Sequence, residues 1–275
     1  MDVMTESTGV AGQWTAKAIE LLQQIAETQT PAIATAAQWS AEAIEEGGFV
    51  HMFGSGHSRI AVEEMFPRYG SFPGFNPMVE LSTTFHTQIV GSNGQRQAMF
   101  IERVSGLADQ ILANFAFGPK DVLIVFSVSG TSAMPVELAL GAKARGLRVI
   151  GVTSRKHSAS SESATGVRLM DVADLVIDIC TDVGDALISI PDFETPVGPG
   201  STVTTVAIVN EIKVQTAELL VQRGIRPPVL TSPAIVGKER SMELFDNAYD
   251  EHSVRIARVL GGIVEARPAI NGLKK

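Results

Sequence analysis

The sequence predicts an α/β fold in which a parallel sheet is covered by helices on both faces. Short, apolar, β-prone segments alternate with segments of helical period along most of the 275 residues. Two of the strand-like segments run directly into loops rich in glycine and serine, and each loop is followed by a helical segment. Such units are typical of parallel sheets, whose ligand-binding loops open at the carboxyl ends of the strands.

The chain begins with two helical segments before the first strand. Residues 14–28 carry isoleucine and leucine at helical spacing, which predicts an amphipathic helix. Thr30 is a good N-cap residue and Pro31 suits a first helical position, so a second helix is expected to start there. It is expected to end at Gly47, a usual place for a left-handed cap, and the first strand is expected at 49–53.

The remaining elements continue the alternation. Pro135 is tolerated only in the first turn of a helix, which puts a helix start close to Ser132. We expect one domain over residues 14–222 with a helical extension over 223–275 packed on it. In chain order, the expected elements are a strand at 121–126, a helix at 133–146, a strand at 148–153, a Ser-rich loop at 154–165, a strand at 174–179, a helix at 203–224 and a helix near 238–260.

Composition excludes several classes of protein. The chain has 22 Lys plus Arg against 30 Asp plus Glu, a net charge of −8, which repels nucleic acid and anionic lipid. The single cysteine, Cys180, has no partner for an internal disulfide. No stretch approaches the roughly 20 apolar residues of a membrane span, and residues 1–13 do not read as a signal peptide. We therefore expect a cytoplasmic protein without nucleic-acid or membrane partners.

The loop SVSGTS at 127–132 has the chemistry of a phosphate site. A Gly-containing turn at a helix N-terminus presents backbone N–H groups, and the helix dipole favours an anion there. Four hydroxyl groups add donors within six residues, and no lysine is needed to hold a phosphate monoester. The alternative is a polar turn in which Ser132 is a plain N-cap. The hydroxyl groups belong to Ser127, Ser129, Thr131 and Ser132.

The loop GSGHSR at 54–59 is of the same type and differs from three better-known motifs. It lacks the third glycine of a dinucleotide-binding fingerprint, which makes a nicotinamide-dependent oxidoreductase the least favoured reading. It is not a nucleophile elbow, because Ile60 stands where that motif needs glycine. A phosphate loop of the type G-x-x-x-x-G-K-[S/T] does not occur in the chain.

Together these motifs resemble the sugar isomerase (SIS) domain family. The resemblance rests on GSGHS after the first strand, S-x-S-G-x-S after a later one and Gly-Ser-Thr opening a helix at 200–202, and it covers roughly residues 14–222. The nearest likeness is to uncharacterised bacterial SIS proteins labelled phosphoheptose isomerase, through the Glu-Glu pair at 63–64 and T-S-x-x-H-S at 153–158.

The resemblance implies a three-layer α-β-α sandwich with a five-stranded, flavodoxin-like parallel sheet that binds a sugar phosphate without a cofactor. It also implies a homodimer or homotetramer with the site near the subunit interface. Phosphate contacts carried over from the family fall on Ser58, Ser127, Ser129 and Ser132, to which we add Thr131 of the same loop. The sugar is expected near Gly54, Ser55, Gly56, His57 and Ser201.

Aldose–ketose isomerisation moves a proton between C2 and C1 through an enediol, so it needs a base and an acid with pKa values near neutrality. Glu64 is the expected base rather than Glu63, because adjacent helical residues point about 100° apart and Glu64 lies nearly two turns after Ser58. His157 and His86 are the expected histidines of the site, although each also fits a polar or half-buried structural role. Among the other candidates, His51 is expected in the core, His252 on the surface, Glu211 in the pocket or on a helix face, and Asp182 and Asp185 at the rim or in a turn.

One position departs from the family. Phosphoheptose isomerases and the related etherases carry a glutamate ten residues after the first-loop serine, where this chain has Arg68. Arg68 pairs either with a second anionic group of the substrate or with Glu64. The leading hypothesis is a sugar-phosphate isomerase; the alternatives are a non-catalytic phosphosugar sensor and an etherase or lyase acting on an amino-sugar phosphate. No metal is expected, because the histidines lack ligand spacing.

Overall fold

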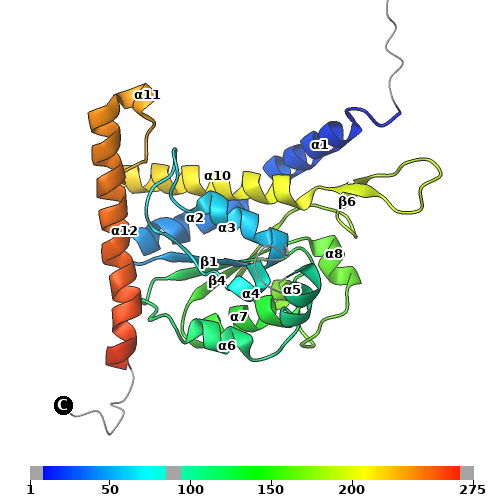
Figure 1. Ribbon diagram of the computed structural model, residues 1–275, viewed down its shortest axis with the longest axis horizontal. Helices are drawn as coiled ribbons and strands as arrows, with labels where there is room; N and C mark the ends of the chain where they lie inside the picture. Colours follow the sequence, from blue (N-terminus) through cyan, green and yellow to red (C-terminus); the bar gives the residue numbers. More distant parts are fainter. Residues whose placement is uncertain (1–8, 85–93, 267–275) are drawn as a thin grey trace, which may run out of the picture.

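The computed structural model describes residues 9–84 and 94–266, and it confirms the predicted fold class (Figure 1). A five-stranded sheet has the order β2-β1-β3-β4-β5, and all neighbouring strands are parallel. One strand of this sheet, β2, was not predicted from the residue pattern, because it is only three residues long and contains Asn and Pro. The strands are β1 (Val50–Gly54), β2 (Phe75–Pro77), β3 (Val122–Phe126), β4 (Arg148–Thr153) and β5 (Leu175–Asp178).

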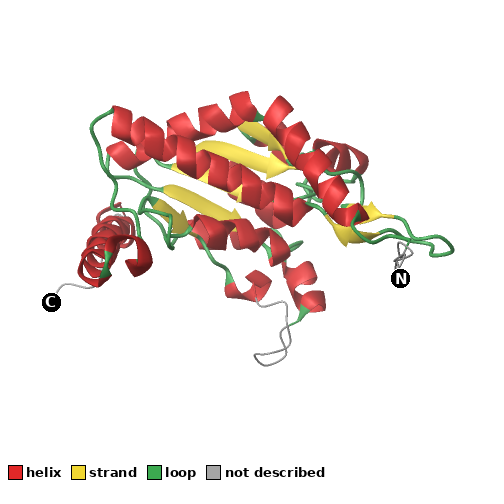
Figure 2. Cartoon of the chain, turned by 90° about the horizontal axis from the view of Figure 1, so that it is seen from above, coloured by secondary structure: helices red, strands yellow, loops and turns green. Residues whose placement is uncertain are grey.

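Helices cover both faces of this sheet, as its mostly apolar central strands require. Successive residues of β3 point to opposite faces: Ile124 packs in the core beneath α2 (Thr30–Glu45) and α10 (Ser201–Gln222), whereas Leu123 packs beneath α7 (Ala133–Ala144). Figure 1 shows α10 and α2 above the sheet and α7 below it, and Figure 2 shows helices of the upper layer in front of the strands. Every residue of β1 and β3 is buried, which explains their lack of polar alternation.

The two N-terminal helices lie close to their predicted ranges, with one correction. The first, α1, spans Gln13–Thr28, and α2 ends just before Gly47, which has the expected left-handed φ of 76°. Thr30 is the first residue of α2 rather than its cap, which is Gln29. The Thr30 hydroxyl donates to the carbonyl of Ala26 in the preceding turn, and α2 has no side-chain cap.

Each of the two glycine- and serine-rich loops leads into a helix, as predicted. Residues Gly56–Ser58 form a 3₁₀ turn, η1, followed by α3 (Arg59–Met65), and Ser132 is the N-cap of α7. The Ser-rich segment at 154–165 was predicted as a loop and instead contains α8 (Arg155–Ser160). Ser154 caps this helix by accepting from the backbone N–H of His157, which offsets the weak helix propensity of its serines.

A buried polar network ties three strands together at the amino edge of the sheet. The carboxylate of Asp121 accepts from the backbone N–H of Phe49 at 2.8 Å, from that of Gly118 at 2.8 Å and from the ring Nε2 of His51 at 3.0 Å. Asn76 of β2 faces the other ring nitrogen of His51 at 3.0 Å. His51 is therefore a core residue, as predicted, and its position is remote from the loops at the carboxyl edge.

The C-terminal helix α12 (Lys238–Ala266) crosses the amino edge of the sheet, on the left in Figure 1. Arg255 donates to the carbonyls of Ile44 and Gly48, which places a cation at the C-terminus of α2, where the helix dipole favours it. His252 was predicted on the surface and is in fact half-buried, because its ring packs edge-on against Phe49 and Phe66. That burial lowers the pKa of His252.

The remaining elements are short and surround the sheet. A two-stranded antiparallel hairpin projects beside α1, and sequence analysis did not predict it (Figure 1). No helix in the described part of the chain is long and apolar enough to cross a membrane. These elements are α4 (Leu81–Thr84), α5 (Gln95–Ile101), α6 (Leu107–Leu112), α9 (Leu169–Val172), β6 (Ala186–Ile188), β7 (Val197–Pro199) and α11 (Pro233–Val236).

Candidate functional site

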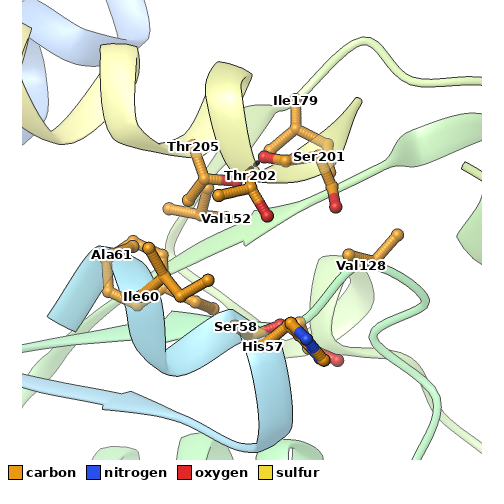
Figure 3. Close-up of a pocket in the computed structure, with 12 residues that line it drawn as sticks. His57, Ser58, Ile60, Ala61, Val128, Val152, Ile179, Ser201, Thr202 and Thr205 are labelled. Carbon is orange, nitrogen blue, oxygen red and sulfur yellow. Dashed lines mark hydrogen bonds between the residues drawn. The ribbon is translucent and has the colours of Figure 1, made fainter. Parts of the chain in front are cut away.

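A cleft opens at the carboxyl ends of β3 and β4, between η1–α3 on one side and the start of α10 on the other (Figure 3). It holds about 380 Å³ of empty space, its open mouth included. This is the edge at which doubly wound sheets bind ligands. Its apolar lining includes Phe126, Val152 and Ile179, and its hydroxyl groups come from Ser58, Ser127, Ser201, Thr202 and Thr205.

The first loop reaches the cleft because of a glycine that nothing larger can replace. A Cβ at Gly54 would lie 2.5 Å from the carbonyl oxygen of Ser58, so the chain can turn back on itself only without a side chain there. The turn places His57 and Ser58 in the cleft lining. Gly56 has a left-handed φ of 53°, which begins the 3₁₀ turn.

The second loop is arranged around Gly130, whose φ is 60°. Its N–H donates to the Ser127 hydroxyl at 3.1 Å, and the Thr131 hydroxyl donates to that of Ser129 at 3.1 Å. Ser127 lines the cleft, whereas Ser129, Thr131 and Ser132 lie outside its lining, around the N-terminus of α7. The five predicted phosphate-binding residues therefore divide between the cleft and the adjoining helix start.

Asp185 organises the third wall of the cleft. Its carboxylate accepts from the N–H of Gly200 at 3.2 Å, from the N–H of Ser201 at 2.8 Å and from the Ser201 hydroxyl. An acidic side chain at a helix N-terminus is stabilising, and here it fixes the first turn of α10. Thr202 on that turn and Thr205 on the next line the cleft. Neither was named from the sequence, although Gly-Ser-Thr at 200–202 marked the place.

None of the described residues that line the cleft is a lysine or an arginine. An anion bound there would be held by hydroxyl groups and by helix N-termini rather than by a cationic side chain. Groups of three or more histidine, cysteine or acidic residues suited to a metal ion do not occur in the part of the chain that the structure describes.

Glu64 lies one turn beyond the residues of α3 that line the cleft, and it is not part of the lining. Its carboxylate accepts from Arg68 at 2.8 Å and from the side-chain amide of Asn210 at 3.2 Å. Its backbone carbonyl accepts from Lys213 at 2.8 Å, a lysine that is only 4% exposed and whose pKa is lowered by that burial. Two partners were considered for Arg68, and in the structure it forms an ion pair with one of them, Glu64.

The histidines are divided among several places. His57 lines the cleft, and His157 lies on α8, where its ring Nδ1 accepts from the N–H of Gly184 at 3.4 Å outside the cleft lining. His86 lies outside the described residues. Glu211, which was left open between pocket and surface, is exposed on α10 and accepts from the amide of Gln215.

A carboxylate that sequence analysis did not name lies beside the first loop. Glu102 accepts from the hydroxyl of Ser55 at 2.8 Å, across 47 positions of the chain. Ser55, like Gly54 and Gly56, is a predicted sugar-binding residue that lies outside the cleft lining. No local pattern around Glu102 marks it, because the contact is made only by folding.

Comparison with known proteins agrees with this architecture. Residues 13–154 match the SIS domain family. A UPF0309 protein of Streptomyces coelicolor is 34% identical over 82% of this chain and 90% of its own length, and one of Geobacillus kaustophilus is 34% identical over 76% and 81%. A phosphoheptose isomerase from Francisella tularensis shares the fold with a TM-score of 0.50 at 19% identity, covering 75% of this chain and 96% of that one. This chain belongs to the SIS domain family.

Proposed function

We propose that this protein binds a phosphorylated sugar at the cleft and the adjoining start of α7. The observation that carries the proposal is the meeting of two hydroxyl-rich loops with the start of α10 around a cleft whose described lining has no lysine or arginine. Hydroxyl groups and helix N-termini suit a phosphate monoester, whereas a polyanion calls for cationic side chains. The shared fold with a protein named phosphoheptose isomerase supports the same ligand class.

In this proposal the phosphate is held by the hydroxyl groups of the two loops. The sugar extends along the first loop and toward the start of α10, so that both walls contribute donors and acceptors. The phosphate-binding residues are Ser58, Ser127, Ser129, Thr131 and Ser132, and the sugar-binding residues are Gly54, Ser55, Gly56, His57 and Ser201.

The proposed reaction is aldose–ketose isomerisation through an enediol. A base removes the proton from C2, and an acid protonates C1 as the carbonyl and hydroxyl oxygens exchange their hydrogen. His57 is the favoured candidate for the base or the acid, because it is a titratable side chain in the cleft lining. Glu64, His157 and His86 remain the other candidates; Glu64 would first have to leave its ion pair with Arg68.

A second candidate function is binding without turnover, as in a metabolite sensor. The ion pair between Glu64 and Arg68 favours it, since the carboxylate expected to act as base is already neutralised by a cation at 2.8 Å. Arg68 stands at the position where the related isomerases carry glutamate. In this chain the nearby carboxylate of Glu64 is held in an ion pair with Arg68 and has a structural role in this second proposal.

We further propose that the protein works as a homodimer or homotetramer. Support comes from exposed apolar side chains on the projecting α1 and on the outer side of α10, among them Ile19, Val214 and Val221. A contact between subunits would cover these side chains, since contiguous exposed apolar surface marks protein–protein interaction sites. Light scattering after size-exclusion chromatography measures the mass directly, and a monomer at micromolar concentration would refute this part of the proposal.

Proton NMR in D₂O tests the function itself. The protein is incubated with a panel of aldose and ketose phosphates, and the C2–H signal of each aldose is followed over time. Loss of that signal with appearance of the ketose would establish isomerase chemistry and identify the substrate. Line broadening of a ligand without exchange would support the sensor instead. If no compound in the panel shows either response, sugar-phosphate binding at this site is refuted.

A further inference from the structure

Glu102 joins the two loops that form the proposed site. It is the C-cap residue of α5, and its carboxylate accepts from the hydroxyl of Ser55 in the first loop at 2.8 Å. Its backbone carbonyl accepts from the N–H of Met134, in the first turn of the helix that follows the second loop, at 3.0 Å. The residue therefore holds a carboxylate at the junction of the two loops.

This carboxylate is not neutralised by a cation in the described part of the chain. Glu63 and Glu64, on the helix that leaves the first loop, each face an arginine, whereas no lysine or arginine pairs with Glu102. An ionised carboxylate offers about four acceptor positions. Among the described residues the Ser55 hydroxyl fills one of them, and the other positions can accept from the donors of a ligand.

Ser55 and Glu102 together present acceptors only. A serine hydroxyl has a single hydrogen, and Ser55 donates it to Glu102, so toward any third group the Ser55 oxygen accepts. Ser55 is 9% exposed and Glu102 is half-buried, so the pair lies at the edge of the loop surface rather than in the core. Such a pair matches hydroxyl or amino groups of a ligand and opposes a carboxylate or a second phosphate through like charge.

We propose that Glu102 is a specificity-determining residue that accepts hydrogen bonds from hydroxyl groups of the sugar and rejects ligands with a second anionic group at that end. This inference rests on the proposed function and narrows its substrate class to phosphorylated sugars that are neutral apart from the phosphate. Phosphorylated sugar acids are the class that it excludes.

Calorimetric titration with three probes tests the inference: inorganic phosphate, glucose 6-phosphate and 6-phosphogluconate. The last two have the same carbon chain and differ in the oxidation of C1, so their affinity ratio reports the charge at the sugar end. Wild-type protein is expected to prefer glucose 6-phosphate by about tenfold, the size of one charged hydrogen bond. Glu102→Gln is expected to remove most of that preference while changing the affinity for inorganic phosphate less than about twofold.

Glutamine keeps the shape of Glu102 and an oxygen that accepts from Ser55, so the variant retains the link between the loops. Ser55→Ala provides a second variant, expected to weaken glucose 6-phosphate without weakening inorganic phosphate. Glu42→Gln is the matched control, because Glu42 accepts from Arg148 at 2.7 Å at the opposite edge of the sheet. Its ligand preference is expected to equal that of the wild type.

Each outcome bears on a different claim. If wild-type protein binds 6-phosphogluconate as tightly as glucose 6-phosphate, or if Glu102→Gln keeps the wild-type ratio, the specificity role is overturned while sugar-phosphate binding stands. If Glu102→Gln weakens all three probes equally, Glu102 only maintains the loops, and the inference is again overturned. If the wild type binds none of the probes, the proposed function fails and the inference fails with it.

Discussion

Asp121→Ala is expected to destabilise the fold strongly, although Asp121 lies far from the proposed site. Its carboxylate is 2% exposed and accepts three hydrogen bonds, two from backbone N–H groups and one from His51. Alanine removes the acceptor and leaves all three donors in place. The variant therefore measures the cost of unpaired buried donors at the edge where β1, β2 and β3 meet.

The magnitude follows from the environment of each donor. An unpaired buried donor costs about 1–3 kcal/mol, so three of them give about 3–9 kcal/mol. A cleft beneath α12, with about 770 Å³ of empty space when its open mouth is included, is lined by Gly118 and Asp121, so water reaches part of the vacated space. We therefore expect a loss near the lower end, about 3–5 kcal/mol in the free energy of unfolding. Asp121→Asn keeps one oxygen acceptor and should lose less, about 1–3 kcal/mol.

Urea denaturation followed by circular dichroism measures both variants against the wild type. Asp246→Ala serves as the control, since Asp246 is exposed on α12, and its midpoint should match the wild type. A loss below about 1 kcal/mol for Asp121→Ala would refute the reasoning, because such a value is no more than the net worth of one ordinary hydrogen bond. Equal losses for Ala and Asn would also contradict it.

Three further predictions follow from single positions. Gly54→Ala should abolish sugar-phosphate binding in calorimetry, because the added Cβ would lie 2.5 Å from the Ser58 carbonyl and force the first loop to move; wild-type affinity would contradict this. Ser129→Ala should weaken sugar-phosphate binding by about 1–3 kcal/mol, the cost of a charged hydrogen bond, and unchanged affinity would remove this serine from the site. Because burial lowers the pKa of His252 below its ordinary 6.5, the unfolded chain binds more protons as pH falls through 6.5. Stability should therefore fall from neutral pH toward the lowered pKa, and His252→Leu should lessen that fall in urea midpoints; an identical pH dependence would show that His252 does not cause it.

Much of the fold was predictable because its signals are local. The two strands that precede the loops are apolar except for His51, the loops follow them directly, and Pro135 places the start of α7 close to Ser132. Weaker signals were missed for the same reason. The strand β2 is three residues with Asn and Pro, and α8 is a single short helix of polar residues whose cap, Ser154, is its main local support.

The candidate site was predictable only in part. Hydroxyl-rich loops can be recognised from their composition, so Ser58, Ser127 and Ser201 were named from the sequence. All three line the cleft. The orientation of Glu64 was not readable, because it depends on Arg68 in the next turn and on Asn210 from a helix almost 150 residues away. The sequence spacing that favoured Glu64 describes one helix, whereas the pocket is formed by several.

By itself the sequence determined the parallel sheet, the loops at its carboxyl edge and the absence of lysine from those two loops. These properties follow from residue type and from periods of two to four residues, which act before any long-range contact forms. Only the tertiary structure decided which polar groups form hydrogen bonds and ion pairs: His51 with Asp121, Glu64 with Arg68 and Asn210, and Ser55 with Glu102. The physical reason is that most of these contacts join distant parts of the chain, and their partners come together only when the helices pack on the sheet.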